Sequence, residues 1–201
     1  MMEIIFATNN QHKVDEIQAA VGQKLTVRTM KEAGINVDIP EPFDTLEANA
    51  LQKSNTVYEL LHTNCFSEDT GLEVEALNGE PGVKSARYAG DEKDFARNID
   101  KLLRKLQDIS NRKARFRTVI SLIWEGEKHF FDGVCEGTIL HAPRGNNGFG
   151  YDSVFVPDQS EKTFAEMEMA EKNVFSHRRI AADKLVLFLQ NATVAESKFD
   201  K

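Results

Sequence analysis

A strong β-hairpin signal lies beyond the middle of the chain. Residues 115–124 (RFRTVISLIW) and 128–136 (KHFFDGVCE) are rich in β-branched and aromatic residues, and Glu125-Gly126-Glu127 separates them. Runs of this kind around a short turn that contains glycine predict two antiparallel strands. Residues 137–140 are expected to prolong this section after a kink at Gly137. The fold therefore has to contain one long antiparallel pair.

The first half of the chain indicates a different pattern, in which strands and helices alternate. Residues 3–7 (EIIFA) have the apolar profile of a buried strand, and residues 12–21 have the apolar spacing of an amphipathic helix. A second strand is expected at 26–29. Asp44 is predicted to cap the next helix, with Glu47 completing a capping-box pattern. These units predict an α/β protein in which the hairpin follows βα units.

Length and composition restrict the class of protein. A chain of 201 residues is long enough for one sizeable domain, expected over residues 1–201, and too short for two comfortable ones. The formal net charge of −7 argues against a partner such as a nucleic acid polymer, whose binders usually carry a basic excess. Two cysteines without CxxC spacing, an N-terminus unlike a signal peptide and no long apolar run predict a cytoplasmic protein with buried thiols and no membrane partner.

Two adjacent acids, Glu68 and Asp69, lie between two predicted strands. An apolar pair precedes them, and alternation of apolar and acidic residues from Leu72 onward predicts a half-buried strand after them. Thr70-Gly71 is interpreted as a tight turn between the two strands. A lone acid pair at a strand end is commonly a surface feature. Cations and a further acid elsewhere in the chain favour a functional site on the rim of the sheet instead.

A phosphate site is predicted at the start of the first helix. Residues 8–11 (TNNQ) break the first strand before a helix N-terminus, where free N–H groups and the helix dipole favour an anion, and Lys13 can add a charge. The alternative is a plain turn with a solvent-facing lysine. Glu41, in a stiff loop between two prolines, supplies a third acid. Together with Glu68 and Asp69 it suits Mg²⁺, which takes a few carboxylates and leaves positions for phosphate oxygens.

The last third of the chain carries groups suited to a flat ring. Residues 143–152 (PRGNNGFGYD) form a loop with three glycines, and Phe149 and Tyr151 are expected to be exposed in a binding loop. A strand is expected at 153–156. Basic residues in the first turn of the last helix, which Ser176 is predicted to cap, oppose the helix dipole and indicate an acceptor opposite them.

Metal ligands, a phosphate cradle and an aromatic platform match a nucleotide, and four motifs resemble the inosine triphosphate pyrophosphatase family of XTP/dITP diphosphatases. The motifs are TNNQHK, SEDTGLEVEALNGEPGVKSARYAG, GFGYD and EKNVFSHR, in that order from residue 8 to residue 178. Each is modest alone, but four in register over nearly the whole chain are highly specific. The resemblance implies a homodimer and a single two-lobed α/β domain around a long mixed β-sheet flanked by helices.

The same resemblance implies hydrolysis of the non-standard purine nucleoside triphosphates ITP, dITP and XTP to the monophosphate and pyrophosphate, with Mg²⁺ as cofactor. Asp69 would be the general base and a metal ligand, with Glu41 as a second ligand and Glu68 as a supporting carboxylate. The positions matching the family's substrate-binding residues are Thr8, Asn9, Asn10, Gln11, His12, Lys13, Thr70, Phe149, Gly150, Tyr151, Asp152, Lys172, His177 and Arg178.

Three positions depart from the family's pattern, and two other functions stay open. Glu68 stands where Asp is common, Ser153 replaces a usual proline, and Lys84 replaces a frequent aromatic residue. A nucleotide-binding regulatory module without catalysis is one alternative. A diphosphatase of modified pyrimidine nucleotides is the other, although the purine-type segment 171–178 argues against it.

Overall fold

The computed structural model describes residues 2–199 and the side chains of residues 3–192. One mixed sheet runs through this part of the chain in the order β2–β1–β3–β5–β6–β7, with the short β4 paired to β3. The strands are β1 (Met2–Phe6), β2 (Leu25–Thr29), β3 (Cys65–Val74), β4 (Pro81–Gly82), β5 (Lys113–Trp124), β6 (Glu127–Ile139) and β7 (Phe155–Pro157). β1 is parallel to β2 and β3, and the later pairs are antiparallel. The expected α/β class is confirmed.

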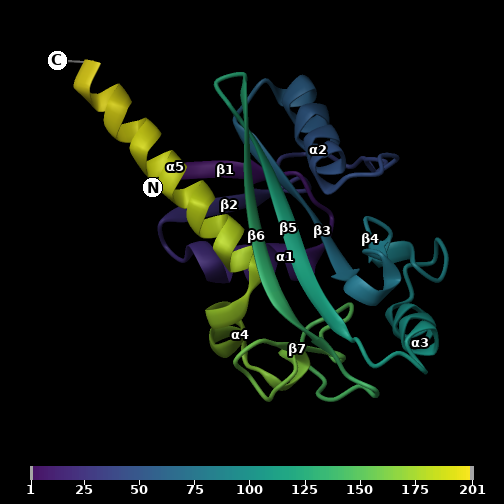
Figure 1. The fold of residues 1–201 in the computed structure, drawn as a ribbon. Coiled ribbons are helices and arrows are strands. Elements are labelled where there is room, and N and C mark those ends of the chain that lie inside the picture. Colours follow the sequence, from purple (N-terminus) through teal and green to yellow (C-terminus); the bar gives the residue numbers. More distant parts are fainter. Residues whose placement is uncertain (1, 200–201) are drawn as a thin grey trace.

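Helices cover both faces of this sheet. They are α1 (Gln11–Val21), α2 (Leu46–Leu61), α3 (Phe95–Lys105), α4 (Met169–Phe175) and α5 (His177–Phe199). α2 packs on β3 and β5, whereas α5 packs on β5, β6 and α1. Figure 1 shows the long hairpin of β5 and β6 running from the part that holds β1, β2 and α2 to the part that holds β7, α3 and α4. None of the helices described is long and apolar enough to cross a lipid bilayer.

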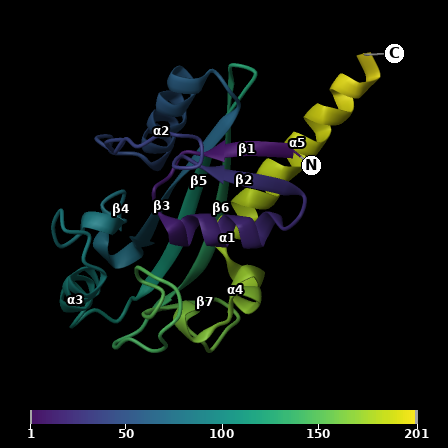
Figure 2. The ribbon, with the colours of Figure 1, turned by 180° about the vertical axis from the view of Figure 1, so that it is seen from behind.

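The hydrophobic core is divided along β3. Phe66 belongs to a cluster under α1 and α5, and Cys65 belongs to a cluster on the opposite face under α2. Leu72 and Val74, at the other end of the strand, belong to a third cluster with Phe116. Figure 2 shows the fold from behind, with α1 beside β1 and β2 and with α3 and α4 farther down the hairpin. The polar middle of β3 therefore lies between apolar cores.

β3 is continuous, so the turn predicted at Thr70-Gly71 is wrong. A Cβ at Gly71 would lie 2.7 Å from the backbone oxygen of Gly82 on β4. The glycine is needed because another backbone approaches it closely, and not because the chain bends there. The acids Glu68 and Asp69 consequently lie inside a central strand and not on the rim of the sheet.

The predicted hairpin is confirmed, and its turn is tighter than expected. Trp124 pairs with Glu127, which leaves Glu125-Gly126 as a two-residue turn with positive φ at both positions. The extension predicted to begin at Gly137 is confirmed as far as Ile139, because β6 continues to that residue. As at Gly71, this glycine makes room for a neighbouring backbone, here β7.

Three other predicted boundaries also change. Thr45 caps α2 in place of Asp44, because its side chain accepts a hydrogen bond from the backbone N–H of Ala48. The strand expected at 153–156 is β7, which begins two residues later. The apolar spacing of residues 94–109 also predicts a helix over that range, and α3 covers only Phe95–Lys105 of it. The first helix and the second strand are confirmed to within a residue.

Gly133 determines how closely α5 approaches the sheet. It lies on β6 beside Thr118 of β5, which in turn lies beside Thr70 of β3. A Cβ at Gly133 would lie 2.1 Å from the carbonyl oxygen of His177 and 2.7 Å from the backbone nitrogen of Ala181. The first turn of α5 therefore packs directly against the backbone of β6. One of the contacting residues is His177, which precedes Arg178 in the chain.

Replacing Gly133 by alanine should destabilise the protein and displace the start of α5. Overpacking a tight contact costs about 1–3 kcal/mol, and here both neighbours are backbone atoms that yield poorly. Urea unfolding of Gly133→Ala measures the loss. Thr138→Ala, at an exposed position of the same strand, is the control and should change stability by less than about 0.5 kcal/mol. Equal stability of the two variants would contradict the close contact.

Candidate active site

A cavity of about 350 Å³ lies along the middle of β3 and receives residues from both parts of the molecule. Most of the residues predicted for the site line it. They are Thr8, Asn9, Asn10, Lys13, Glu41, Asp69, Thr70, Phe149, Gly150, Tyr151, Asp152, Lys172, His177 and Arg178. His12 and Glu68 contact this group but do not line the cavity, and Gln11, which does not line it either, donates to Asp15 of α1. The sequence motifs thus converge on one place.

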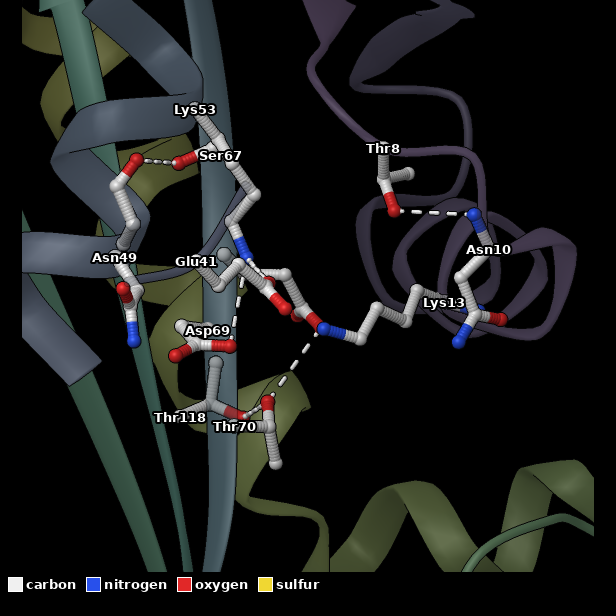
Figure 3. A network of polar contacts seen from close by, with 12 residues as sticks. Thr8, Asn10, Lys13, Glu41, Asn49, Lys53, Ser67, Asp69, Thr70 and Thr118 are labelled. Carbon is white, nitrogen blue, oxygen red and sulfur yellow. Dashed lines mark hydrogen bonds and ion pairs between the residues drawn. The ribbon is translucent and has the colours of Figure 1, made fainter. Parts of the chain in front are cut away.

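The first end of the cavity is built by the turn between β1 and α1. The hydroxyl of Thr8 accepts a hydrogen bond from the backbone N–H of Asn10, and the side chain of Asn10 caps α1 by accepting from the N–H of Lys13. Figure 3 shows Thr8, Asn10 and Lys13 on the side of the view opposite Asp69, with the side chain of Lys13 extending toward β3. A helix N-terminus with a lysine beside it favours an anion.

The side chains of the two adjacent acids of β3 point to opposite faces of the sheet, because side chains alternate along a strand. Asp69 faces α2, where the Nζ atom of Lys53 lies 3.4 Å from its Oδ1. Glu68 faces α1 and α5, where Lys13 and Arg178 hold it. The acid pair in the sequence is therefore two separate groups in the structure.

Lys53 joins Asp69 to Glu41. Its ammonium group is 2.5 Å from Oε1 of Glu41, and Arg87 donates to the other oxygen of that carboxylate at 3.1 Å. Burial alone would raise the pKa of Glu41, but Lys53, Lys13 and Arg87 hold the pKa at about 2. Burial raises the pKa of Asp69 despite the nearby lysines. One carboxylate is thus firmly ionised, and the other is a stronger base than an ordinary aspartate.

A buried ionic network fills the other end. Arg178 donates to both oxygens of Glu68, at 2.7 and 2.9 Å, and to Glu16 of α1. Glu16 also accepts from Lys172 at 2.6 Å, and Lys172 donates to Asp152 at the same distance. All of these side chains are at most 6% exposed. The acceptor expected opposite the basic start of α5 is confirmed, and it is a pair of acids.

The loop at residues 143–152 is partly different from its prediction. Tyr151 is buried, and its hydroxyl donates to the backbone oxygen of Ser85, so the expected exposed aromatic is wrong at this position. Phe149 is half-buried and lines the cavity. Asp152 turns back to accept from the N–H of Phe149, and Gly148, with φ of 72°, leaves room for that carboxylate. The loop is thus fastened at its end and open at its aromatic tip.

His177 is buried in the cavity wall with its ring stacked on Phe116, 4.7 Å between centroids. Burial and the charges of Arg178 and Lys172 lower its pKa well below the ordinary value, so the ring is neutral. Its Nδ1 atom has no hydrogen-bond partner among the described residues. A buried polar atom without a partner is costly, which makes this atom a natural contact for a polar ligand.

Three charged residues of the site were missed from the sequence. Lys53 and Glu16 each lie on an amphipathic helix, among the residues of its buried side. A charged residue within a buried stripe is the signal that could have found them. Arg87 was noted only as part of a motif, and nothing local indicates that it reaches Glu41.

Comparison with known proteins shows one family along nearly the whole chain. Residues 4–188 match the Ham1 family. A dITP/XTP pyrophosphatase of Porphyromonas gingivalis is 49% identical over 190 residues, which cover 94% of this chain and 98% of that protein. The solved Ham1 protein of Staphylococcus aureus has a TM-score of 0.85 at 39% identity, covering 94% and 99% of the two chains. That of Coxiella burnetii has a TM-score of 0.86 at 36% identity, covering 95% and 100%.

Two neighbouring arginines test the buried network. Arg178→Met would leave Glu68 and Glu16 buried without their main cation, and breaking such a pair costs about 3–5 kcal/mol. Arg179→Met removes only a partly exposed pair with Asp183, worth less than about 1 kcal/mol. Urea unfolding of both variants measures the difference. Similar losses would show that Arg178 does not hold the network together.

The lowered pKa of Glu41 predicts a loss of stability in acid. The pKa of this carboxyl is about 2 in the folded protein against an ordinary 4.5, so its contribution is present above pH 4.5 and is lost as the pH falls toward 2. Urea midpoints measured across this window should fall less steeply in Glu41→Gln than in the unsubstituted protein. Glu59→Gln, on the exposed side of α2, should keep the original slope. The idea fails if Glu41→Gln keeps that slope too.

Proposed function

The chain belongs to the Ham1 family, and we propose that it is a nucleoside-triphosphate diphosphatase that hydrolyses ITP, dITP and XTP to the nucleoside monophosphate and pyrophosphate. A single cavity joins an anion-binding helix start, two carboxylates around a lysine, and an aromatic tip beside buried hydrogen-bond donors, and this observation carries the proposal. Relatives at 44–49% identity that bear the name dITP/XTP pyrophosphatase support it. A homodimer in the cytoplasm is part of the proposal.

The triphosphate is assigned to the end of the cavity where Thr8, Asn10 and Lys13 meet Lys53. The two lysines come from different helices and can neutralise different oxygens of the phosphate chain. Lys13 is held 3.2 Å from Glu68 and Lys53 is held by two acids, so both cations are oriented before substrate arrives. Such preorganised charge is more effective than charge that must reorient.

Mg²⁺ fits the pair Glu41 and Asp69, because both carboxylates already converge on one positive charge, the ammonium of Lys53. No group of three or more His, Cys, Asp or Glu side chains in the described residues is arranged to hold a metal alone. This suits Mg²⁺, which is commonly bound by one or two carboxylates plus substrate phosphates. When bound, the ion would neutralise phosphate charge. Glu68 is assigned to Arg178 and not to the metal, because it does not line the cavity.

Asp69 is proposed as the general base for the attacking water. Its raised pKa makes it a better proton acceptor than an ordinary aspartate, and Lys53 beside it favours the ionised form that can accept the proton. The proton moves from water to a carboxylate oxygen of Asp69 as the water oxygen bonds to phosphorus. Pyrophosphate leaves when the α–β anhydride bond breaks, and Lys13 can stabilise the charge that forms.

The base is proposed to be read by Lys172, His177 and Arg178. A 6-oxo purine offers an acceptor at the position where adenine offers an NH₂ donor. The side chains of Lys172 and Arg178 can only donate hydrogen bonds, and buried acids fix their positions. They therefore favour the 6-oxo group, whereas the NH₂ group of adenine would place a donor against these donors. Sites built on hydrogen bonds can discriminate by as much as roughly 10⁴-fold. The Nδ1 atom of neutral His177, which is unpaired within the described part of the chain, provides one further polar contact.

A substrate panel with Asp69→Asn tests the proposal. ITP, dITP and XTP with Mg²⁺ should release pyrophosphate, and Asp69→Asn should lower kcat by about 10²- to 10⁴-fold, the usual contribution of a general base. Asp183→Asn, on the exposed side of α5, is the matched control and should keep full activity. Enzyme-coupled detection of pyrophosphate and orthophosphate distinguishes the products.

Three outcomes would overturn parts of the proposal. Release of orthophosphate alone would reject cleavage of the α–β bond. Tight ITP binding without turnover at any concentration of Mg²⁺ or Mn²⁺ would indicate a regulatory module. Faster turnover of methylated dUTP than of dITP would indicate a pyrimidine enzyme.

A further inference from the structure

An exposed phenylalanine of α3 lies beside Phe149 at the cavity. Phe95 is the first residue of α3, is 40% exposed, and lines the cavity. Its ring centroid lies 6.1 Å from that of Phe149, with an angle of 48° between the planes. Scattered exposed apolar side chains are ordinary, but this one faces the aromatic tip of a separate loop inside a cavity. The pair therefore forms two walls of one opening.

The position of Phe95 is fixed by the helix that carries it. Asp94 caps α3 by accepting from the N–H of Arg97. Asn98, one turn into the helix, accepts from the N–H of Ala89 and donates to the backbone oxygen of Ala86. These bonds fasten the start of α3 to the segment that follows β4. The ring is thus held on a rigid element, as a binding residue requires.

Phe149, which forms the other wall of the opening, stacks on a residue that lies outside the cavity. His12 stacks on Phe149 with centroids 5.0 Å apart and planes 14° apart, and His12 does not line the cavity. The ammonium of Lys172 and the guanidinium of Arg178 lie 5.6 and 5.7 Å from the Phe149 centroid. A flat ring placed between Phe149 and Phe95 would thus have hydrogen-bond donors close to its edge.

We propose that Phe95 is a second stacking residue for the nucleobase, which enters between Phe95 and Phe149. The inference rests on the proposed function, because it takes the purine end of the cavity from there. Two stacked contacts require about 7 Å between the outer rings, so the present 6.1 Å must widen slightly and the planes must become parallel. Gly148 and Gly150, both with positive φ, flank Phe149 and allow its loop to adjust.

Stacking from Phe95 acts on affinity and not on the choice of base. Every purine has the same π-face, whereas the donors at the ring edge distinguish one base from another. A contact made equally in the ground state and the transition state changes KM and leaves kcat unchanged. Loss of Phe95 should therefore weaken all nucleotides alike, and should leave ligands without a base unaffected.

Phe95→Ala tests the inference, with two probes that differ in the base. One probe is ITP, as substrate and as ligand of the Asp69→Asn protein in calorimetry, and the other is inorganic tripolyphosphate as an inhibitor and ligand. We expect the KM and Kd of ITP to rise about 5- to 150-fold, as for loss of one base–aromatic stack, with kcat within about 2-fold. Tripolyphosphate binding should stay within about 2-fold. Phe95→Trp should retain tight ITP binding.

Phe130→Ala is the matched control, because Phe130 is a similarly exposed phenylalanine (46%) on β6 that does not line the cavity. It should leave both probes unaffected. Unchanged ITP binding in Phe95→Ala, or an equal loss of tripolyphosphate binding, would overturn the inference. Failure of the proposed function is distinguishable, since it would appear as absent hydrolysis or absent ITP binding before Phe95 is changed. If Phe95→Ala does not fold, Phe95→Leu provides the same comparison.

Discussion

The arrangement of the site depends on the ionic contacts of Arg178, which lies in the last third of the chain and is buried between two acids from the first half. Glu16 lies on the first helix and Glu68 on the central strand, and the guanidinium holds both. Burying these charges costs free energy that only close pairing offsets. Since each acid also holds a lysine, Lys172 or Lys13, the contact fixes side chains on both sides of the cavity. The groups proposed to read the base and the group proposed to hold phosphate thus share one rigid support.

The acids on the opposite side of β3 are arranged differently. Glu41 and Asp69 share the ammonium of Lys53, and both line the cavity, whereas Glu68 does not. Their pKa values shift in opposite directions, because cations surround Glu41 while burial prevails at Asp69. Two carboxylates on one lysine can therefore have different roles: one stays ionised, and the other can take up a proton.

Sequence reasoning succeeded where the determining contacts are local. The hairpin of β5 and β6, the helix after the first strand and the motifs of the cavity depend on residues close together in the chain. Sequence reasoning failed where the contacting residues lie far apart in the chain. Glu16 meets Lys172 and Arg178, which lie 156 and 162 residues away, and Gly71 looks like a turn residue until Gly82 is placed against it. Spacing along a chain does not indicate which backbones will touch.

The alternation of side chains along β3 makes the two acids non-exchangeable despite their similar chemistry. Glu68 and Asp69 are neighbours in the chain, but a slip of one residue in the pairing of β3 with β5 would turn each toward the other's partners. The shorter Asp69 would then face Arg178, and the longer Glu68 would face Lys53. The different roles proposed for the two carboxylates therefore depend on the register between β3 and β5. The long pairing of these strands fixes which face of the sheet each acid points toward.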